Sequence, residues 1–337
     1  MNVKRMTKRT EFYVMMIIIA FCMLVQVRSG QFFTGNNIVD LLRSMTIPIM
    51  FCIGEMMVLL SGGVDCSFPA IASLSMYFVC TKMDGMFSNP LPYFLVAILL
   101  GLCMGALNGF IVAKFKFPAL IVTLGTSALF LGIMQGVLGS SEYPLTKALY
   151  SLGSVKLLTA KNPQSGLTSD LPIHFIFMIV LVVLAWLLLN KTMIGRGIYA
   201  VGGDEVAATR AGFNVFGTRI FIFCLSGALA GFIGVSRASM LLTVSPNNMI
   251  GMDMDVIAAC VLGGVSLVGG RGSIVGAILG TILMTIVSNS LILLGVPTQW
   301  SRVFTGIIII VGTAVSAIQE QRRKKKLFVA VSEKPEV

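Results

Sequence analysis

Residues 92–113 read PYFLVAILLGLCMGALNGFIVA, an apolar run of 22 residues without a charged side chain. As an α-helix this run would be about 33 Å long, enough to cross a hydrocarbon core roughly 30 Å thick. Similar runs fill most of the chain: hydrophobic residues make up 56% of the sequence and charged residues 12%. That charged share is about half of what a soluble domain carries. The sequence therefore predicts an all-α polytopic membrane protein.

Ten apolar segments of the sequence are candidates for crossing the membrane. The third and the eighth are shorter than a full crossing, which favours re-entrant or broken helices, so we expect eight to ten transmembrane helices. We take residues 1–337 as a single transmembrane domain. The ten segments lie near residues 12–27, 38–60, 68–80, 92–113, 118–138, 172–190, 219–241, 254–268, 274–294 and 303–318.

The basic residues indicate how the segments are oriented. With a cytoplasmic N-terminus and ten alternating spans, most of the 25 Lys and Arg residues fall on the inner side. The positive-inside rule supports this arrangement, with both termini cytoplasmic. It gives a basic N-terminal tail at 1–11, a cytoplasmic loop at 191–218 and a basic C-terminal tail at 319–337. The RRKKK run at 322–326 is expected to contact anionic membrane lipid. Topology thus accounts for the net charge of +11. The sequence has no clustered basic face of the kind that would predict nucleic-acid binding.

The loop at 191–218 looks ordered rather than linker-like. Its Gly202–Gly203 pair predicts a turn, after which Asp204 would cap a short helix near residues 204–211. A helix this short gains little from its own hydrogen bonds, so it should pack against something. Docking of a partner is one interpretation, and an ordinary capped connector is the other. If a partner docks here, bulky β-branched residues at Gly203 or Gly212 are expected to uncouple its activity from that of the membrane domain. The candidate coupling residues are Gly202, Gly203, Asp204, Ala207, Ala208, Arg210 and Gly212.

Few polar side chains fall within the predicted spans. Glu55 lies deep in the second span, where it must face a partner or a cavity; a purely structural role is equally compatible. Asp65 stands in the glycine-rich SGGVDCSFP stretch at 61–69, where an acid needs internal partners or water. Asn108 is more often an interhelical hydrogen-bonding residue than a ligand. Together with Asn289, these residues are the candidates for a substrate pathway.

Several kinds of chemistry are not indicated. The single histidine, His174, stands at a span boundary, so the sequence offers no nucleophile–base pair that would predict an enzyme. The seven cysteines fall mostly within spans, which favours small packing residues over a metal site or a disulfide framework. Neither a GxxxxGK[ST] nor a strand-linked GxGxxG loop is present, so we expect no bound nucleotide and no cofactor.

Three glycine-rich segments together carry a family likeness. They read SGGVDCS at 61–67, GRGIYAVGGDEVAATRAGFNV at 195–215 and VLGGVSLVGGRGSIVGAILG at 261–280. In this order and spacing they resemble the ribose, xylose and galactose permeases, the membrane subunits of ATP-binding-cassette sugar importers, a group that includes the autoinducer-2 permeases. The likeness covers residues 40 to 315. Cys66, Phe68 and Pro69 depart from the family's usual SGGIDLSVG, and Asp204 replaces a usual Asn.

The resemblance implies a permease of the bacterial inner membrane that forms a pathway for a monosaccharide or small polyol. It also implies a second permease copy or a homologous permease, cytoplasmic ATPase subunits docked below, and an extracytoplasmic sugar-binding protein above. Residues 195–215 would then be the coupling segment. The alternative is an ion-coupled secondary transporter of small polar solutes, in which intramembrane acids would carry the coupling ion; no convincing internal repeat supports it.

Overall fold

The computed structural model describes residues 10–162, 166, 168–295, 297, 300, 303, 306, 307 and 310. Helices dominate this part of the chain, and seven of them are long and apolar enough to cross a membrane, which confirms the predicted polytopic helical fold. The seven are α2 (Thr10–Ser29), α3 (Gly35–Leu60), α5 (Leu91–Phe115), α6 (Ala119–Ile133) with its π-helical extension η1 (Met134–Leu138), α8 (His174–Lys191), α11 (Val215–Leu241) and α13 (Ile274–Leu293). The tenth predicted span and both basic tails lie mostly outside the described residues.

Two short helices occupy the positions of the third and eighth predicted spans. They are α4 (Phe68–Lys82) and α12 (Met252–Leu262), of 15 and 11 residues. Each adjoins a glycine-rich break, because α4 follows the irregular residues 61–67 and α12 is separated from α13 by residues 263–273. The eighth span ends earlier than the predicted residue 268, since Gly264 adopts a φ of +89° that favours glycine and stops the helix. The expected broken helices are therefore present.

Helix α3 is the centre of the helix bundle. Most of its apolar stretch is buried (78%), compared with 17% for α2, which packs on α13 at the edge. Helices α8, α11, α12 and α13 all contact α3. Residues 45–60 of α3 are therefore largely enclosed by other helices, and a polar side chain in this part of the helix must find its partners within the protein.

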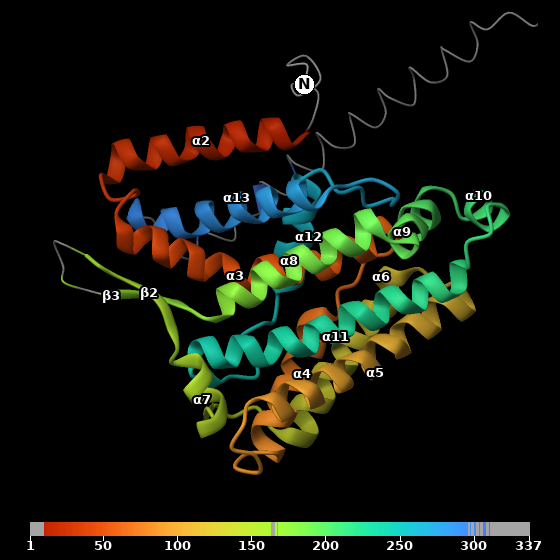
Figure 1. The fold of residues 1–337 in the computed structure, drawn as a ribbon, viewed down its shortest axis with the longest axis horizontal. Coiled ribbons are helices and arrows are strands. Elements are labelled where there is room, and N and C mark those ends of the chain that lie inside the picture. Colours follow the sequence, from red (N-terminus) through yellow and green to blue (C-terminus); the bar gives the residue numbers. More distant parts are fainter. Residues whose placement is uncertain are drawn as a thin grey trace, which may run out of the picture.

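Helices α5 and α11 form the most extensive pair in the described structure, and they lie side by side in Figure 1. Glycines allow this close approach: a Cβ on Gly101 or Gly105 of α5 would run into the backbone of α11, at Gly227 and Phe223. In the other direction, a Cβ on Gly231 would meet the carbonyl oxygen of Ala97. Small residues of this kind are what bring membrane helices into direct backbone contact.

The two long connectors lie at opposite ends of the bundle (Figure 1). The connector after η1 carries α7 (Lys147–Gly153) and three of the four strands of the described structure, none of which the sequence analysis predicted. Strand β1 (Tyr143–Pro144) pairs with β4 (Thr243–Val244), and β2 (Lys156–Lys161) pairs with β3 (Thr168–Pro172). The β2–β3 pair packs on α3, near the start of that helix.

An ion pair links β2 and β3 across the connector. Lys156 Nζ lies 2.6 Å from Asp170 Oδ2, and the Thr159 hydroxyl donates to Asp170 Oδ1 at 2.6 Å. The hydrogen bonds from Lys156 and Thr159 lower the pKa of the partly exposed Asp170 carboxyl below its usual value. An ion pair and a side-chain hydrogen bond therefore join the two strands of the hairpin, in addition to its contact with α3.

Candidate functional site

The connector at the other end of the bundle is helical almost throughout. Helix α9 (Met193–Gly203) is capped by the preceding residue, Thr192, whose hydroxyl accepts from the Gly195 amide at 3.1 Å. Helix α10 (Glu205–Arg210) follows after one extended residue, Asp204. The predicted short helix and its cap are confirmed, because Asp204 Oδ1 accepts from the amides of Val206 and Ala207 at 2.9 Å each.

The turn expected at Gly202–Gly203 was wrong. Both glycines are the last residues of α9, and the chain changes direction at Asp204, where φ is −159° and ψ is 110°. Neither residue has a positive φ, and only at position 202 is glycine needed for a close contact, because a Cβ there would collide with other backbone. The sequence pattern of paired glycines does not distinguish these two uses.

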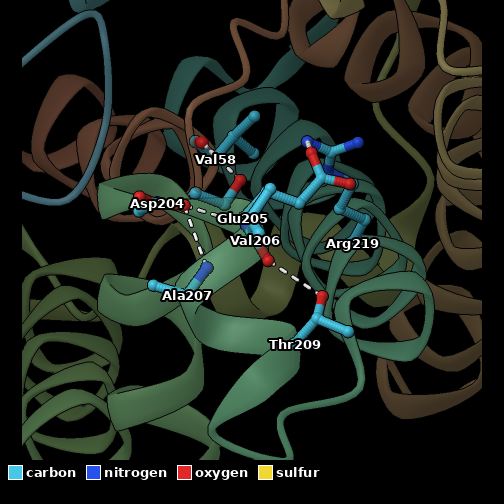
Figure 2. A network of polar contacts seen from close by, with 8 residues as sticks. Val58, Asp204, Glu205, Val206, Ala207, Thr209 and Arg219 are labelled. Atoms are coloured by element: carbon cyan, nitrogen blue, oxygen red, sulfur yellow. Dashed lines mark hydrogen bonds and ion pairs between the residues drawn. The ribbon is translucent and has the colours of Figure 1, made fainter.

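The first residue of helix α10, Glu205, forms an ion pair with α11. Glu205 Oε2 accepts from Arg219 Nη2 at 2.8 Å, and the two side chains meet over the helix in Figure 2. The ion pair lines a cavity of about 260 Å³ between α10, α11, the start of the α3–α4 break and the connector from α5 to α6. Ala208 is buried (3% exposed), so it packs toward the bundle. Val206, 61% exposed, lies on the outward side of the helix.

The three glycine-rich segments meet at one place, which we call the glycine contact: residues Leu60, Gly62, Gly202, Gly269 and Gly270. The Gly270 amide donates to the Leu60 carbonyl at 2.8 Å. A Cβ on Gly202 would collide with the same carbonyl oxygen, and one on Gly269 would lie 2.7 Å from the backbone of both Gly202 and Gly62. The end of α9 is therefore in direct backbone contact with both helix breaks.

Tyr199 forms a hydrogen bond beside the glycine contact. Its hydroxyl, one turn before Gly203 on α9, donates to the Gly272 carbonyl at 3.1 Å, and burial raises the pKa of this phenol. Two other candidate glycines have room for a side chain of their own, although the backbone of Gly203 lies against Gly270, where an added Cβ would be 2.6 Å from the Gly203 Cα. A Cβ on Gly203 or Gly212 would meet nothing within 4 Å, although Gly212 has a φ of +86° and so favours glycine.

The α3–α4 break carries a buried polar network that begins at Asp65. Its carboxylate accepts from the Ser67 amide at 2.8 Å, from the Ser67 hydroxyl at 2.6 Å and from the Ser226 hydroxyl of α11 at 3.3 Å. Asn108 of α5 donates to Ser67 Oγ at 2.8 Å, and Glu55 of α3 accepts from the Asp65 amide at 3.2 Å. All five residues are at most 2% exposed. The network ties the break to three surrounding helices.

The network brings together three of the four predicted pathway residues. Glu55, Asp65 and Asn108 belong to it, whereas Asn289 lies elsewhere, on the wall of a separate cavity. Glu55 Oε2 and Asn108 Oδ1 are buried without a hydrogen-bond partner among the described residues. Ser67 and Ser226 were missed by the sequence analysis. Ser67 belongs to the quoted SGGVDCS segment, but nothing in the sequence links Ser226 to it.

Removing the Asn108 amide is expected to weaken the network. We predict that Asn108→Leu, of similar size, lowers the free energy of unfolding by about 1–3 kcal/mol, because it strips a buried donor from Ser67. Thermal unfolding in detergent measures this. The matched control is Asn190→Leu on α8, whose exposed amide, among the residues that the structure describes, bonds only to the Trp186 carbonyl in the same helix. Equal melting temperatures for both variants would contradict a stabilising role of the network.

Comparisons with known proteins agree on one family. Residues 37–312 match the family model described as "Branched-chain amino acid transport system / permease component". The chain is 31% identical to the autoinducer 2 import system permease protein LsrC of Photorhabdus luminescens, over 91% of this chain and 89% of that protein. It is 30% identical to the ribose import permease protein RbsC of Haemophilus influenzae, over 90% and 91% of the two chains. The comparison with solved structures gave no match.

Proposed function

We propose, on the premise that this chain belongs to the permease-component family just described, that it forms the membrane pathway of an ATP-driven sugar importer. The match to RbsC over 90% of the chain carries the proposal, because it includes all three glycine-rich segments and names a ribose permease. The family is one of transport permeases rather than enzymes. The substrate is proposed to be a monosaccharide or a similar small polyol.

The partners follow from this proposal. ATP would be hydrolysed by separate cytoplasmic subunits that dock on α10, and a sugar-binding protein would deliver substrate at the opposite end, where α7 and the β2–β3 hairpin lie. A second copy of this chain, or a homologous permease, would complete the pathway. The exposed Val206 and the fixed Glu205–Arg219 pair support docking, because they present a rigid, accessible helix face.

Transport measured in proteoliposomes tests the proposal. The chain is reconstituted with candidate ATPase and binding-protein subunits of the same organism, and uptake of radiolabelled D-ribose, D-xylose and D-galactose is followed. We expect uptake of at least one sugar that requires internal ATP and stops with a non-hydrolysable ATP analogue. Uptake driven by a proton or sodium gradient without ATP would instead establish the secondary-transporter alternative.

The orientation of the chain gives a further prediction. With the α9–α10 connector on the cytoplasmic side, both termini are proposed to be cytoplasmic in the inner membrane. Alkaline phosphatase fused at the C-terminus is then expected to be inactive, since this reporter requires export. The control fusion is placed after Lys161, in the opposite connector, and should be active. An active C-terminal fusion would overturn this topology.

A further inference from the structure

The cavity beside the Glu205–Arg219 ion pair carries more positive than negative charge on its walls. It measures about 260 Å³, and four segments border it: α10, α11, the start of the α3–α4 break and the connector from α5 to α6. The ionisable side chains that line it within the described structure are Lys116, Glu205 and Arg219. Because Glu205 and Arg219 balance each other at 2.8 Å, Lys116 leaves one positive charge in excess.

Lys116, on the α5–α6 connector, is available to a ligand. Its backbone has a φ of +54°, in the left-handed region that favours glycine, and Leu242 is the one other non-glycine residue of the described structure in this region. The side chain is exposed, and it forms no ion pair or hydrogen bond with any other residue that the structure describes. Such backbone outliers are common at functional sites, so a lysine here suggests a role for its charge.

Further hydrogen-bond donors border the same cavity. The Arg219 guanidinium has five N–H donors, and Glu205 accepts from one of them among the described residues. Helix α6 begins at Ala119 without a side-chain cap, and both Ala119 and the preceding Pro118 line the cavity. The first amides of a helix lack intrahelical partners and lie at the positive end of its dipole. They add to the attraction that Lys116 exerts on an anion.

The charge and the spread of the donors favour one class of ligand. A cation would be repelled, and a neutral solute would leave Lys116 without a counter-charge. The donors come from separate segments, which a phosphate group can reach with up to three terminal oxygens, whereas a carboxylate has two in one plane. The Ser61 hydroxyl donates to the Val58 carbonyl at 2.7 Å, so its oxygen can still accept, as can the Glu205 carboxylate. Both acceptors suit hydroxyl groups of the ligand.

We propose that this cavity binds a phosphate ester of a small polyol, with Lys116 as the counter-charge of the phosphate. Arg219 and the first amides of α6 would hydrogen-bond the phosphate oxygens, and Glu205 and Ser61 would accept from the hydroxyls. The volume is below the roughly 300–1,000 Å³ of pockets for drug-sized ligands, as a small ester requires.

Two sources share this chemistry. One is a soluble phosphate ester, such as a sugar phosphate. The other is the glycerol phosphate headgroup of phosphatidylglycerol, because the cavity lies where the membrane-spanning helices α5 and α11 end and begin. In either case the occupant would contact α10 and the α3–α4 break at once, since both border the cavity.

Binding to the purified chain in a maltoside detergent, which contains no phosphate, tests the site. D-ribose 5-phosphate and glycerol 3-phosphate are the soluble probes, D-ribose and glycerol are their neutral counterparts, and calorimetry measures Kd. Native mass spectrometry measures retention of added phosphatidylglycerol, with phosphatidylcholine as the comparison. Lys116→Gln should weaken binding at least about tenfold, because a charged hydrogen bond is lost. The control is Lys114→Gln, which removes an exposed charge from the last turn of α5 outside the cavity and should leave binding unchanged.

The outcomes separate the two sources and the refutation. A soluble ester that binds the unaltered chain at least about tenfold more tightly than Lys116→Gln assigns the site to a soluble metabolite. Phosphatidylglycerol retained by the unaltered chain but not by Lys116→Gln, without binding of the soluble esters, assigns it to membrane lipid. If neither ligand binds in a manner that depends on Lys116, or if D-ribose binds as tightly as its phosphate, the site is refuted. Every readout is binding, so the result does not depend on whether the chain imports sugar.

Discussion

Replacing Gly202 with valine is expected to abolish ATP-dependent sugar uptake. The added Cβ would collide with the carbonyl oxygen of Leu60 and lie 2.7 Å from the amide nitrogen of Gly270. Both are backbone atoms, so the strain cannot be relieved by rotating a side chain, and α9 must move away from the two helix breaks. Overpacking of this kind costs about 1–3 kcal/mol, or roughly a five- to 150-fold change in an equilibrium. Uptake and ATP hydrolysis, measured together, should become uncoupled.

The adjacent glycine provides the matched control. A Cβ on Gly203 would have no other heavy atom within 4 Å, and the residue does not have a positive φ. Gly203→Val should therefore leave uptake close to that of the unaltered chain, contrary to what the glycine pattern alone predicts. If the two single variants, Gly202→Val and Gly203→Val, reduce uptake equally, the effect comes from the connector as a whole and the glycine contact has no special role.

A second large effect is expected at the α5–α11 interface. Gly105→Ala should prevent most of the protein from folding, because the methyl group would collide with the Phe223 carbonyl and lie 3.1 Å from the Gly227 Cα. The helices would have to separate along the most extensive contact of the described structure. The yield of monodisperse protein, followed by fluorescence-detected size-exclusion chromatography of a fusion, measures this loss.

The same substitution elsewhere is expected to have the opposite sign. A Cβ on Gly132 of α6 would meet nothing within 4 Å. Within a helix, alanine is favoured over glycine by roughly 1 kcal/mol, since glycine loses more backbone freedom on folding. Gly132→Ala should therefore leave the yield unchanged or raise it. A similar loss of yield in both variants would show that close backbone packing is not what requires glycine at position 105.

The helical architecture could be predicted because it depends on local composition. Lipid excludes charge and requires internal hydrogen bonding, so apolar runs alone locate the spans, including the short ones beside SGGVDCS and VLGG. The cap at Asp204 was equally local, since an acidic side chain reaches only the amides two and three residues ahead. Such features leave a mark within a few neighbouring residues of the sequence.

The candidate site was harder to predict from the sequence, because its parts come from distant segments. The glycine contact joins residues 60, 62, 202, 269 and 270, and each glycine looks the same in sequence whether it serves a turn or a close approach. Ser226 is one of several small residues on α11, and only the packing of that helix aims it at Asp65. Likewise, Ala207 and Ala208 look equivalent in the sequence, but the orientation of α10 in the structure exposes Ala207 and buries Ala208.

Photo-crosslinking from α10 tests the central claim, that this connector receives a cytoplasmic ATPase subunit. Benzoylphenylalanine is incorporated at Val206, which is exposed, and as a control at Val183 on α8, which is also exposed but lies within a membrane-spanning helix. After irradiation of cells that express the complete importer, crosslinked products are identified by mass spectrometry. We predict a product between position 206 and an ATP-binding subunit, and none from position 183. A product from position 206 with the extracytoplasmic binding protein, or none with any ATP-binding subunit, would contradict the account.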